Sequence, residues 1–443
     1  MPTPLFLLDR PLTNGDLETY DEQLRQLQGN ILKSHGRNET ASIFLTFLPG
    51  QIDGVRDFLH TMARRVTSAQ QQEAQARARE RNELFTGLWL SAEGYKFLGH
   101  SLTGFDLTFR QGMRGAKERL DDPPVENWEP KFREQIHALV TFAHSDRTVV
   151  SAKLDDLRGE VGSIASVSSE LGHAMRDGDR AFEHFGFLDG VSQPIFFAKD
   201  LPDATSRAQW DPSAGPRLVL RQDPLGTREE CGSYFVFRKL EQNVKRFKLR
   251  RKALARKLGV STAVAGAMIM GRFEDGTPIT KRQSENGRRE NDFNYGADGH
   301  GHVCPFFSHI RKANPRGATD NGIPGAEGVH RIARRGITYG DPTPRNGSSS
   351  HWPENGVGVL FQCCQAVLSN QFETIQGRWA NDPSFIRAGV GQDAVIGQRG
   401  QTRIAFPAGR GSAARVPFDF GEFIHMRGGE YFFAPAKSVL GRL

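Results

Sequence analysis

Runs of residues with the apolar, β-branched and aromatic character of strands alternate along this chain with segments of helical periodicity. In the first half, the strand-like runs cover residues 40–48, 84–91, 137–146 and 163–175. The helical segments between them cover residues 53–82, 92–99 and 147–162. A similar order begins again in the second half, with strand-like runs at 233–240, 356–365 and 428–436 and helical segments at 243–259 and 366–382. This alternation predicts an α+β fold with antiparallel pairs, built from two β-α-β-rich halves that join near residue 180.

Length and composition agree with two domains of ordinary size or with one large α/β unit. The chain has 443 residues, of which 37% are hydrophobic and 25% charged, as in globular proteins. Phenylalanine is abundant, with 31 residues against 6 tyrosines and 5 tryptophans, and such rings either fill a core or line an apolar pocket. A long stretch rich in glycine, asparagine, arginine and histidine, residues 270–356, is a place to look for chemistry, because extended loops are commonly functional.

The net charge of +7 raises the question of an anionic partner. The densest basic run is residues 243–259, in which Val244, Phe247, Leu254 and Leu258 recur at helical spacing. This spacing predicts an amphipathic helix whose basic face is solvated. A surface for nucleic acid is the alternative, and it predicts salt-dependent affinity for DNA.

The cysteines and the N-terminal residues bear on the cellular location. Four cysteines in a chain of this length do not make a disulfide framework, which favours a reducing compartment. The first residues, MPTPLFLLDRPLTNG, lack the basic and apolar regions of an export signal, and no run of 18 apolar residues predicts a transmembrane helix. We therefore expect a cytoplasmic protein that binds no membrane.

Asp189 is the one acidic residue of the stretch GFLDGVSQP, residues 186–194, where it lies between Gly186 and Gly190. An aspartate followed by glycine is a common turn dipeptide, so the stretch has an ordinary structural explanation. A functional role for Asp189 needs support from the rest of the chain.

Several metal-binding residue types gather in residues 291–316, namely His300, His302, Cys304 and His309. Three imidazoles and a thiol could bind zinc. Strand-like spacing puts the first three on one side, however, and no second close pair of ligands follows them. His309 differs, because it stands between the apolar CPFF and the basic IRK, where a pocket wall would give way to a charged rim. A hydrogen-bonded structural histidine is the alternative at this position.

Arginines cluster in VHRIARRGITYG, residues 329–340, which contains Arg331, Arg334 and Arg335. Such clusters bind carboxylates or phosphates, or stabilise a developing negative charge; ion pairs with neighbouring acids are the alternative. The chain has no HExxH, CxxC, GxxxxGK[ST] or GxSxG motif. Zinc-protease, P-loop and α/β-hydrolase chemistry therefore loses most of its support.

Together these segments resemble the dye-decolorising (DyP-type) haem peroxidases, in their longer, soluble bacterial and fungal branch. GFLDGVSQP is similar to the GxxDG motif of that family, CPFFSHIRKANPR to the segment with its axial histidine, and IARRGITYG to the segment with its distal arginine. QGNILKSHGR, YFVFRKLEQNV, GRFEDGTPI, VGVLFQ and GGEYFFAPA match as well, so the resemblance runs from about residue 28 to 436. Several motifs in the correct order are more specific than any one of them.

The resemblance implies a fold and an activity. The fold is two ferredoxin-like domains with antiparallel sheets, residues 1–180 and 181–443, with haem in a cavity mainly of the second half. The cofactor is haem b (iron protoporphyrin IX), and the activity is reduction of H2O2 through high-valent iron with oxidation of dyes, phenolic or other aromatic one-electron donors. No nucleic acid is expected as a partner, and there is room for a homo-oligomer. A haem carrier or sensor is the alternative, but a carrier needs neither Asp189 nor Arg334.

On the proximal side, the resemblance makes His309 the axial ligand of the haem iron. Glu422 matches the acidic position that hydrogen-bonds to the proximal imidazole, with Asp419 as the alternative in a neighbouring register. A carboxylate on the second ring nitrogen fixes the tautomer and makes the ligand more basic.

On the distal side, the resemblance makes Asp189 the acid/base that moves a proton of H2O2, and Arg334 the residue that stabilises negative charge as the O–O bond breaks. Arg335 follows directly, so the choice of arginine depends on the register. Val359 and Phe361 match positions where the family lines its distal pocket with apolar side chains.

Three further groups of residues follow from a haem site. Gly186 and Gly190 would let the backbone pass close to a flat macrocycle and adopt positive φ beside the acid. The two propionates need basic partners, for which the candidates nearest the motifs are Arg311, Arg331 and His330. Surface electron relays would be aromatic residues near the motifs, and packing is the alternative for each of Tyr339, Trp379 and Trp352.

Overall fold

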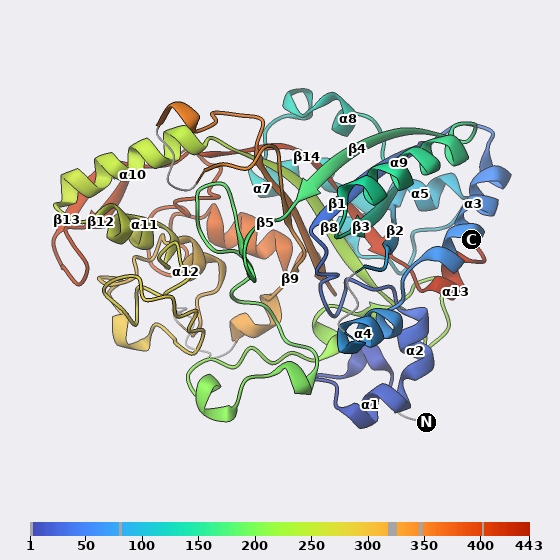
Figure 1. The fold of residues 1–443 in the computed structure, drawn as a ribbon, viewed down its shortest axis with the longest axis horizontal. Coiled ribbons are helices and arrows are strands. Elements are labelled where there is room, and N and C mark those ends of the chain that lie inside the picture. The colour runs from blue at the N-terminus through green and yellow to red at the C-terminus, as the bar shows by residue number, and fades with distance from the viewer. Residues whose placement is uncertain (1–2, 79–81, 318–325, 345–348, 401–402) are drawn as a thin grey trace.

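A long antiparallel sheet forms the centre of the molecule. The computed structural model describes residues 3–78, 82–317, 326–344, 349–400 and 403–443. The main strands lie in the order β10-β11-β8-β14-β2-β3-β1-β4, with two short strands, β7 and β9, paired to β8 and β11. Figure 1 shows helices α3 and α9 on one side of this sheet and helices α10 to α12 on the other.

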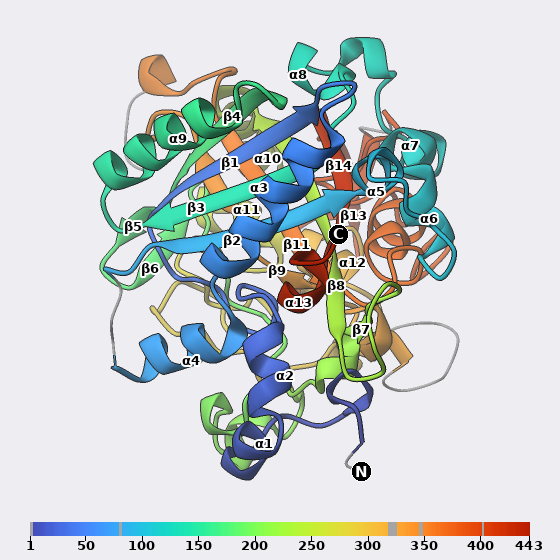
Figure 2. The ribbon, with the colours of Figure 1, turned by 90° about the vertical axis from the view of Figure 1, so that its right-hand side faces the viewer.

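The first half of the chain has the strand order of a ferredoxin-like fold. Its strands are β1 (Glu39–Phe47), β2 (Phe85–Ser91), β3 (Ala138–His144) and β4 (Ala165–His173). They lie in the order β2-β3-β1-β4, with α3 (Ile52–Arg65) between β1 and β2 and α9 (Arg147–Val161) between β3 and β4. Both helices cross the same face of these strands (Figure 2). In α3 the buried residues recur every three or four positions, which is the stripe that packs a helix on a sheet: Val55, Phe58, Leu59 and Met62.

The second half repeats this topology. Its strands are β8 (Cys231–Gln242), β10 (Ile337–Tyr339), β11 (Gly358–Gln365) and β14 (Ile424–Ala434), in the order β10-β11-β8-β14. If the strands of each half are numbered from one to four, both halves read 2-3-1-4. The expectation of two ferredoxin-like halves with antiparallel sheets is therefore confirmed.

The two halves share one continuous sheet. Strand β14 pairs with β2, so that Phe432 lies opposite Ser91 and Phe433 opposite Leu90. At the far ends of the sheet, the hydroxyl of Thr338 in β10 donates to the backbone carbonyl of His173 in β4. The division into residues 1–180 and 181–443 stays a prediction.

The remaining elements surround this sheet. The other helices are α1 (Asn14–Thr19), α2 (Asp21–Gln26), α4 (Ala69–Ala78), α5 (Ala92–Phe97), α6 (Leu107–Gln111), α7 (Lys117–Leu120), α8 (Pro130–Arg133), α10 (Val244–Leu258), α11 (Thr262–Met270), α12 (His309–Ala313) and α13 (Lys437–Leu440). A π-helix, η10, covers Thr374–Ala380. The short strands are β5 (Met175–Asp177), β6 (Arg180–Phe182), β7 (Arg221–Gln222), β9 (Ala333–Arg334), β12 (Arg403–Pro407) and β13 (Arg415–Asp419).

Two helical expectations were only partly right. The segment 53–82 divides into α3 and α4, because Val66 is extended and the Ser68 hydroxyl accepts from the backbone N–H of Gln71 at 3.1 Å, which starts a new helix. Of the segment 366–382, the regular part is chiefly the π-helix η10. A π-helix is rare and is commonly found at functional sites.

The basic run forms the amphipathic helix α10, as predicted. Val244, Phe247, Leu254 and Leu258 are buried, and basic residues of the outer face make ion pairs, such as Lys245 with Glu354 at 2.7 Å. Within the described residues no single helix is long and apolar enough to cross a bilayer; α10 and α11 pass that test together but are bent by 109°.

A buried ion pair ties the sheet to the segment after α7. Arg238 of β8 and Asp122 have side chains that are 2% and 0% exposed, and Nη1 of Arg238 donates to Oδ2 of Asp122 at 2.9 Å. Removing one partner of such a pair leaves an uncompensated buried charge.

Asp122→Ala is expected to lower the free energy of unfolding by about 3–5 kcal/mol, because the Arg238 guanidinium would stay buried without its counter-ion. Urea denaturation followed by circular dichroism measures this change. The control is Asp155→Ala, which breaks a pair with Arg158 whose carboxylate is 72% exposed and which should leave stability nearly unchanged. Equal effects of the two substitutions would contradict the prediction.

Candidate active site

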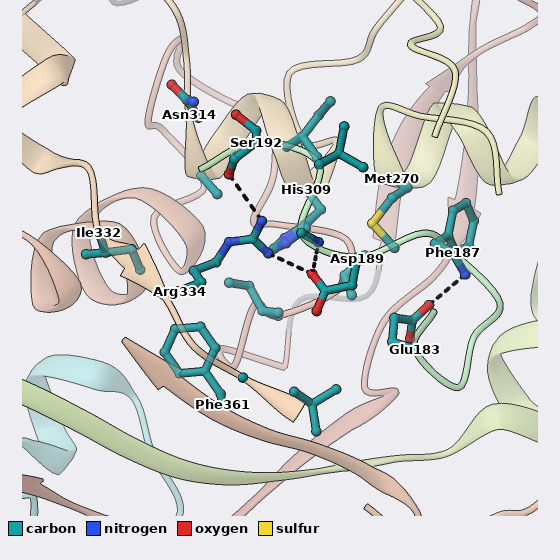
Figure 3. Close-up of a pocket in the computed structure, with 18 of the residues that line it drawn as sticks. Glu183, Phe187, Asp189, Ser192, Met270, His309, Asn314, Ile332, Arg334 and Phe361 are labelled. Atoms are coloured by element: carbon teal, nitrogen blue, oxygen red, sulfur yellow. Dashed lines mark hydrogen bonds and ion pairs between the residues drawn. The ribbon is translucent and has the colours of Figure 1, made fainter. Parts of the chain in front are cut away.

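A cavity of about 290 Å³ lies in the second half, next to strands β8 and β11 (Figure 3). Its size is close to the lower end of the range for small-molecule and cofactor sites. Much of its wall is apolar, including Phe187, Leu188, Phe273, Ile310, Val359, Phe361, Phe372 and Val395. The same cavity is lined by Asp189, His309 and Arg334. Asp189 and Arg334 are 145 positions apart along the chain.

His309 is held by a carboxylate behind it. Nδ1 of His309 lies 2.9 Å from Oδ2 of Asp393, whose side chain is 0% exposed. The other oxygen of Asp393 accepts backbone N–H groups of Val395 at 2.8 Å and Ile396 at 3.0 Å, which fixes the carboxylate. Because a carboxylate accepts, a neutral His309 carries its proton on Nδ1 and presents the lone pair of Nε2.

The partner predicted for this imidazole was wrong. Glu422 has a 48% exposed side chain that pairs with Arg246 at 3.1 Å, and it does not line the cavity. Asp419 is exposed too, and its backbone carbonyl accepts from Arg250 at 3.1 Å. Both residues contact the basic helix α10, Glu422 through its carboxylate and Asp419 through its backbone carbonyl, whereas Asp393 comes from a loop that no motif marked.

Lys312, one turn after His309, fixes the short helix α12. Its ammonium group donates to the backbone carbonyls of Trp379, at 3.2 Å, and of Asp382, near the end of η10. Burial lowers the pKa of Lys312 to about 8. A cation at the last carbonyls of a helix is favourable, so this contact joins the segment with His309 to the π-helix.

Asp189 reaches the cavity from a tight loop. Its backbone N–H donates to the carbonyl of Ala181 at 2.8 Å, and its Oδ1 accepts from the backbone N–H of Gly190 at 2.6 Å and from Nη1 of Arg334 at 3.1 Å. No described residue donates to Oδ2. The side chain is 38% exposed, so this second oxygen is available to a molecule in the cavity.

The structure separates the two neighbouring arginines. Arg334 lies in β9, where its guanidinium contacts Asp189 and the carbonyl of Ser192 at 3.3 Å (Figure 3). Arg335 is 9% exposed and donates to the carbonyls of Asn30 and Ile31, each at 2.6 Å. Of these two neighbours, Arg334 lines the cavity and Arg335 points into the protein; the role of Arg334 as the distal arginine stays a prediction.

Glu183 is a functional candidate that the sequence did not reveal. Its carboxylate lines the cavity and accepts the backbone N–H groups of Phe185 and Phe187, each at 2.9 Å, and the side-chain amide of Gln242 at 2.6 Å. Burial raises the pKa of Glu183. These hydrogen bonds shape the loop that presents Asp189. In the sequence, only the position of this glutamate just before the aromatic turn FGF could have indicated its role.

Both glycines beside Asp189 have positive φ, at 105° for Gly186 and 75° for Gly190. Gly190 lines the cavity, and a Cβ there would meet no atom within 4 Å. Gly186 does not line it; its missing Cβ would lie 3.4 Å from the Glu274 carboxylate. The expected close approach of Gly186 to a ligand stays a prediction, and what the structure shows for it is the turn that its positive φ allows.

Of the three basic residues expected near the propionates, only Arg331 lines the cavity. Arg311 is fully buried and binds Asp298 at 2.9 Å, so it is a core residue. His330 contacts the carbonyl of Asn370 and the ring of Trp379 outside the cavity. Proximity to a motif in sequence was a poor guide, because the short helix α12 points Arg311 away from His309.

Arg316 was missed by the sequence reasoning and does line the cavity. Its guanidinium donates to backbone carbonyls, including that of Phe293 at 2.8 Å, and lies 4.8 Å from the ring of Trp210. Burial lowers the pKa of Arg316 to about 10 and that of its neighbour Arg272 to about 9. Arg316 and Arg331 are thus among the arginines that line the cavity.

The apolar residues predicted for the distal pocket line the cavity, whereas the aromatic residues predicted as electron relays do not. Val359 and Phe361 line the cavity from β11, as expected. The three proposed relays are at most 7% exposed and do not line the cavity, and their role stays a prediction: Tyr339, Trp379 and Trp352.

A zinc site finds no support. In the described parts of the chain no cluster of three histidine, cysteine, aspartate or glutamate residues is arranged to hold a metal ion. Cys304 is a buried free thiol, and His300 and His302 stack on one another with ring centres 5.5 Å apart.

Known proteins share this architecture. The family model described as "DyP dimeric alpha+beta barrel domain" matches residues 26–177. The multifunctional dye peroxidase DyP2 of an Amycolatopsis species is 38% identical over 95% of this chain and 96% of its own length. The solved DyP-type peroxidase of an Anabaena species superposes with a TM-score of 0.90 at 37% identity, covering 97% of both chains. A fungal DyP-type peroxidase from Auricularia auricula-judae gives 0.81 at 25% identity, covering 94% of this chain and 98% of that one.

The similarity covers both halves of the fold. At this identity and coverage, the chain belongs to the family of dye-decolorising (DyP-type) peroxidases.

Proposed function

We propose that this peroxidase uses haem b, with His309 as axial ligand, to reduce hydrogen peroxide and to oxidise dyes and other aromatic one-electron donors. One observation carries the proposal: a histidine with a free Nε2 and an ion-paired aspartate and arginine line one cavity. The names of the two relatives from Amycolatopsis and Auricularia auricula-judae, both dye peroxidases, support the activity. A haem carrier has no use for the pair of Asp189 and Arg334.

The residues of the cavity fit a haem group. His309 presents a nitrogen lone pair, the walls are largely apolar, and Arg316 and Arg331 line the cavity with positive charge that suits two propionates. When bound there, haem supplies an iron that exchanges electrons with peroxide and with the reducing substrate.

On the proximal side, Asp393 acts through His309. Its carboxylate holds the Nδ1 proton, fixes the ring orientation and increases the basicity of the imidazole. A more basic axial ligand favours higher oxidation states of iron.

On the distal side, Asp189 moves a proton and Arg334 stabilises negative charge. The free oxygen of Asp189 is placed to accept a proton from hydrogen peroxide and to return it to the departing oxygen as the O–O bond breaks. Arg334 orients this carboxylate by its bond to Oδ1 and presents a fixed positive charge where negative charge develops. Apolar side chains such as Phe361 exclude bulk water from the same space.

We also propose that the protein is cytoplasmic and can form a homo-oligomer. Four buried free thiols support a reducing, cytoplasmic environment. A homo-oligomer is to be sought by analytical ultracentrifugation of the holoenzyme.

The test is the absorption spectrum of the haem-reconstituted protein before and after one equivalent of H2O2, together with the rate of dye oxidation. A Soret band that changes on addition of peroxide, with dye turnover, supports the proposal. If no haem binds, the proposal fails; if haem binds but peroxide changes neither the spectrum nor the dye, the carrier function replaces it.

Asp393→Asn is expected to lower peroxidase activity by about 10–100-fold and to raise the reduction potential of the haem, since the neutral amide makes His309 a weaker donor. Spectroelectrochemistry and steady-state rates measure the two effects. Glu422→Gln is the matched control and should change neither. If Glu422→Gln alters the potential and Asp393→Asn does not, the assignment of the proximal partner is wrong.

A further inference from the structure

Methionine side chains differ sharply in their exposure. Among the methionines that the structure describes, only Met175 and Met270 are partly exposed. The other four have exposed fractions of 2% or less: Met62, Met113, Met268 and Met426. Met270 lines the cavity that holds Asp189 and His309, whereas Met175 lies in β5, outside that lining (Figure 3).

Met270 is held firmly beside α12. The Ser308 hydroxyl, at the start of α12, donates to the carbonyl of Met268 at 2.6 Å. Gly271 ends α11 with a φ of 95°, and a Cβ at this residue would lie 2.3 Å from Cγ1 of Ile310. The end of α11 is therefore packed directly on the helix that carries the axial histidine. The backbone of Met270 is therefore fixed beside the cavity.

We infer that Met270 is a site of oxidative modification: hydrogen peroxide that reacts in the cavity converts its thioether into a sulfoxide, and this lowers the activity. The inference rests on the proposed peroxidase function. A lone pair of the sulfur forms the S–O bond as the O–O bond breaks, and the other peroxide oxygen leaves as water with both protons. The sulfur is oxidised by two electrons and the peroxide is reduced by two.

The product changes the cavity. A sulfoxide is polar and carries a strong hydrogen-bond acceptor, whereas the thioether is apolar and flexible. Arg334 is the donor that orients Asp189 in this space, and a new acceptor in the same cavity competes for such donors. Oxidation of Met270 therefore limits the number of turnovers when the reducing substrate is scarce.

Mass spectrometry can locate the added oxygen. The haem-loaded protein is treated with an excess of H2O2 without reducing substrate, and a parallel sample lacks haem. Trypsin releases residues 258–272, with Met268 and Met270, and residues 159–176, with Met175. In the haem-loaded sample we expect Met270 to be oxidised about tenfold faster than Met175, and Met268 to stay unmodified. A reducing dye should slow the modification of Met270.

The outcomes separate this inference from the function on which it rests. If the haem-loaded protein oxidises dye but Met270 stays unmodified, or is modified no faster than Met175, only the inference fails. Oxidation of Met270 in the haem-free sample as well supports the step, in which peroxide itself is the oxidant, whereas absence of oxidation in both samples overturns it. A protein that neither binds haem nor oxidises dye overturns the peroxidase function and the inference with it.

Two variants test the effect on activity. Met270→Leu removes the sulfur with little change in volume. We expect its activity, relative to its own initial rate, to decay about threefold more slowly in H2O2 than that of the wild type, while Met175→Leu decays like the wild type. If Met270→Leu decays as fast as the wild type, modification of Met270 does not limit the activity.

Discussion

His309→Ala is expected to lose haem affinity and more than about 100-fold of the peroxidase activity. Changes to residues that only support a metal ligand cost about 10–100-fold, and this substitution removes the ligand itself. It also leaves the buried carboxylate of Asp393 without the ring that it contacts at 2.9 Å. The intensity of the Soret band after haem titration measures the affinity, and dye oxidation measures the activity.

Addition of free imidazole to His309→Ala tests whether loss of the ring itself causes these effects. Imidazole fits the space left by the deleted ring and can donate to Asp393, so it should restore part of the Soret band and of the activity in His309→Ala. His300→Ala is the matched control, because that ring lies outside the cavity lining, and it should behave like the wild type. Normal haem binding by His309→Ala would show that another residue is the ligand.

Arg334→Leu is expected to slow the reaction with H2O2 by about 10²–10³-fold while haem binding is retained. The estimate is the usual cost of removing one fixed donor that stabilises charge in the transition state. The substitution also frees Oδ1 of Asp189 from its bond at 3.1 Å, so the carboxylate is less well oriented. Stopped-flow absorption at increasing peroxide concentrations gives the second-order rate constant.

The control for this variant is Arg246→Leu, which removes an arginine that pairs with Glu422 on the surface helix α10. It should react with peroxide at the wild-type rate. A rate for Arg334→Leu within a few-fold of that control would mean that the arginine does not act on the departing oxygen. Loss of haem in Arg334→Leu would instead assign it a structural role.

Local patterns in the sequence determined the secondary structure and the repeat. Alternating apolar residues and helical stripes depend on neighbours two to four positions away, so β1, α3, β8 and α10 could be predicted from the chain alone. The motifs that resemble a family likewise identified His309, Asp189 and Arg334, whose surroundings in sequence are distinctive.

Only the tertiary structure decided which residues meet. Asp393 lies 84 residues from His309 and was missed, whereas Glu422 seemed suitable from its place in a motif but is drawn to Arg246. Arg334 and Arg335 are adjacent, so the local sequence does not distinguish them. Only the pairing of β9 with β11 turns Arg334 toward the cavity. Such contacts depend on where distant backbones pass and on which charges they bring together. The sequence by itself therefore determined the chemistry available in this protein, and the packing of segments that are distant along the chain decided which side chains act as partners.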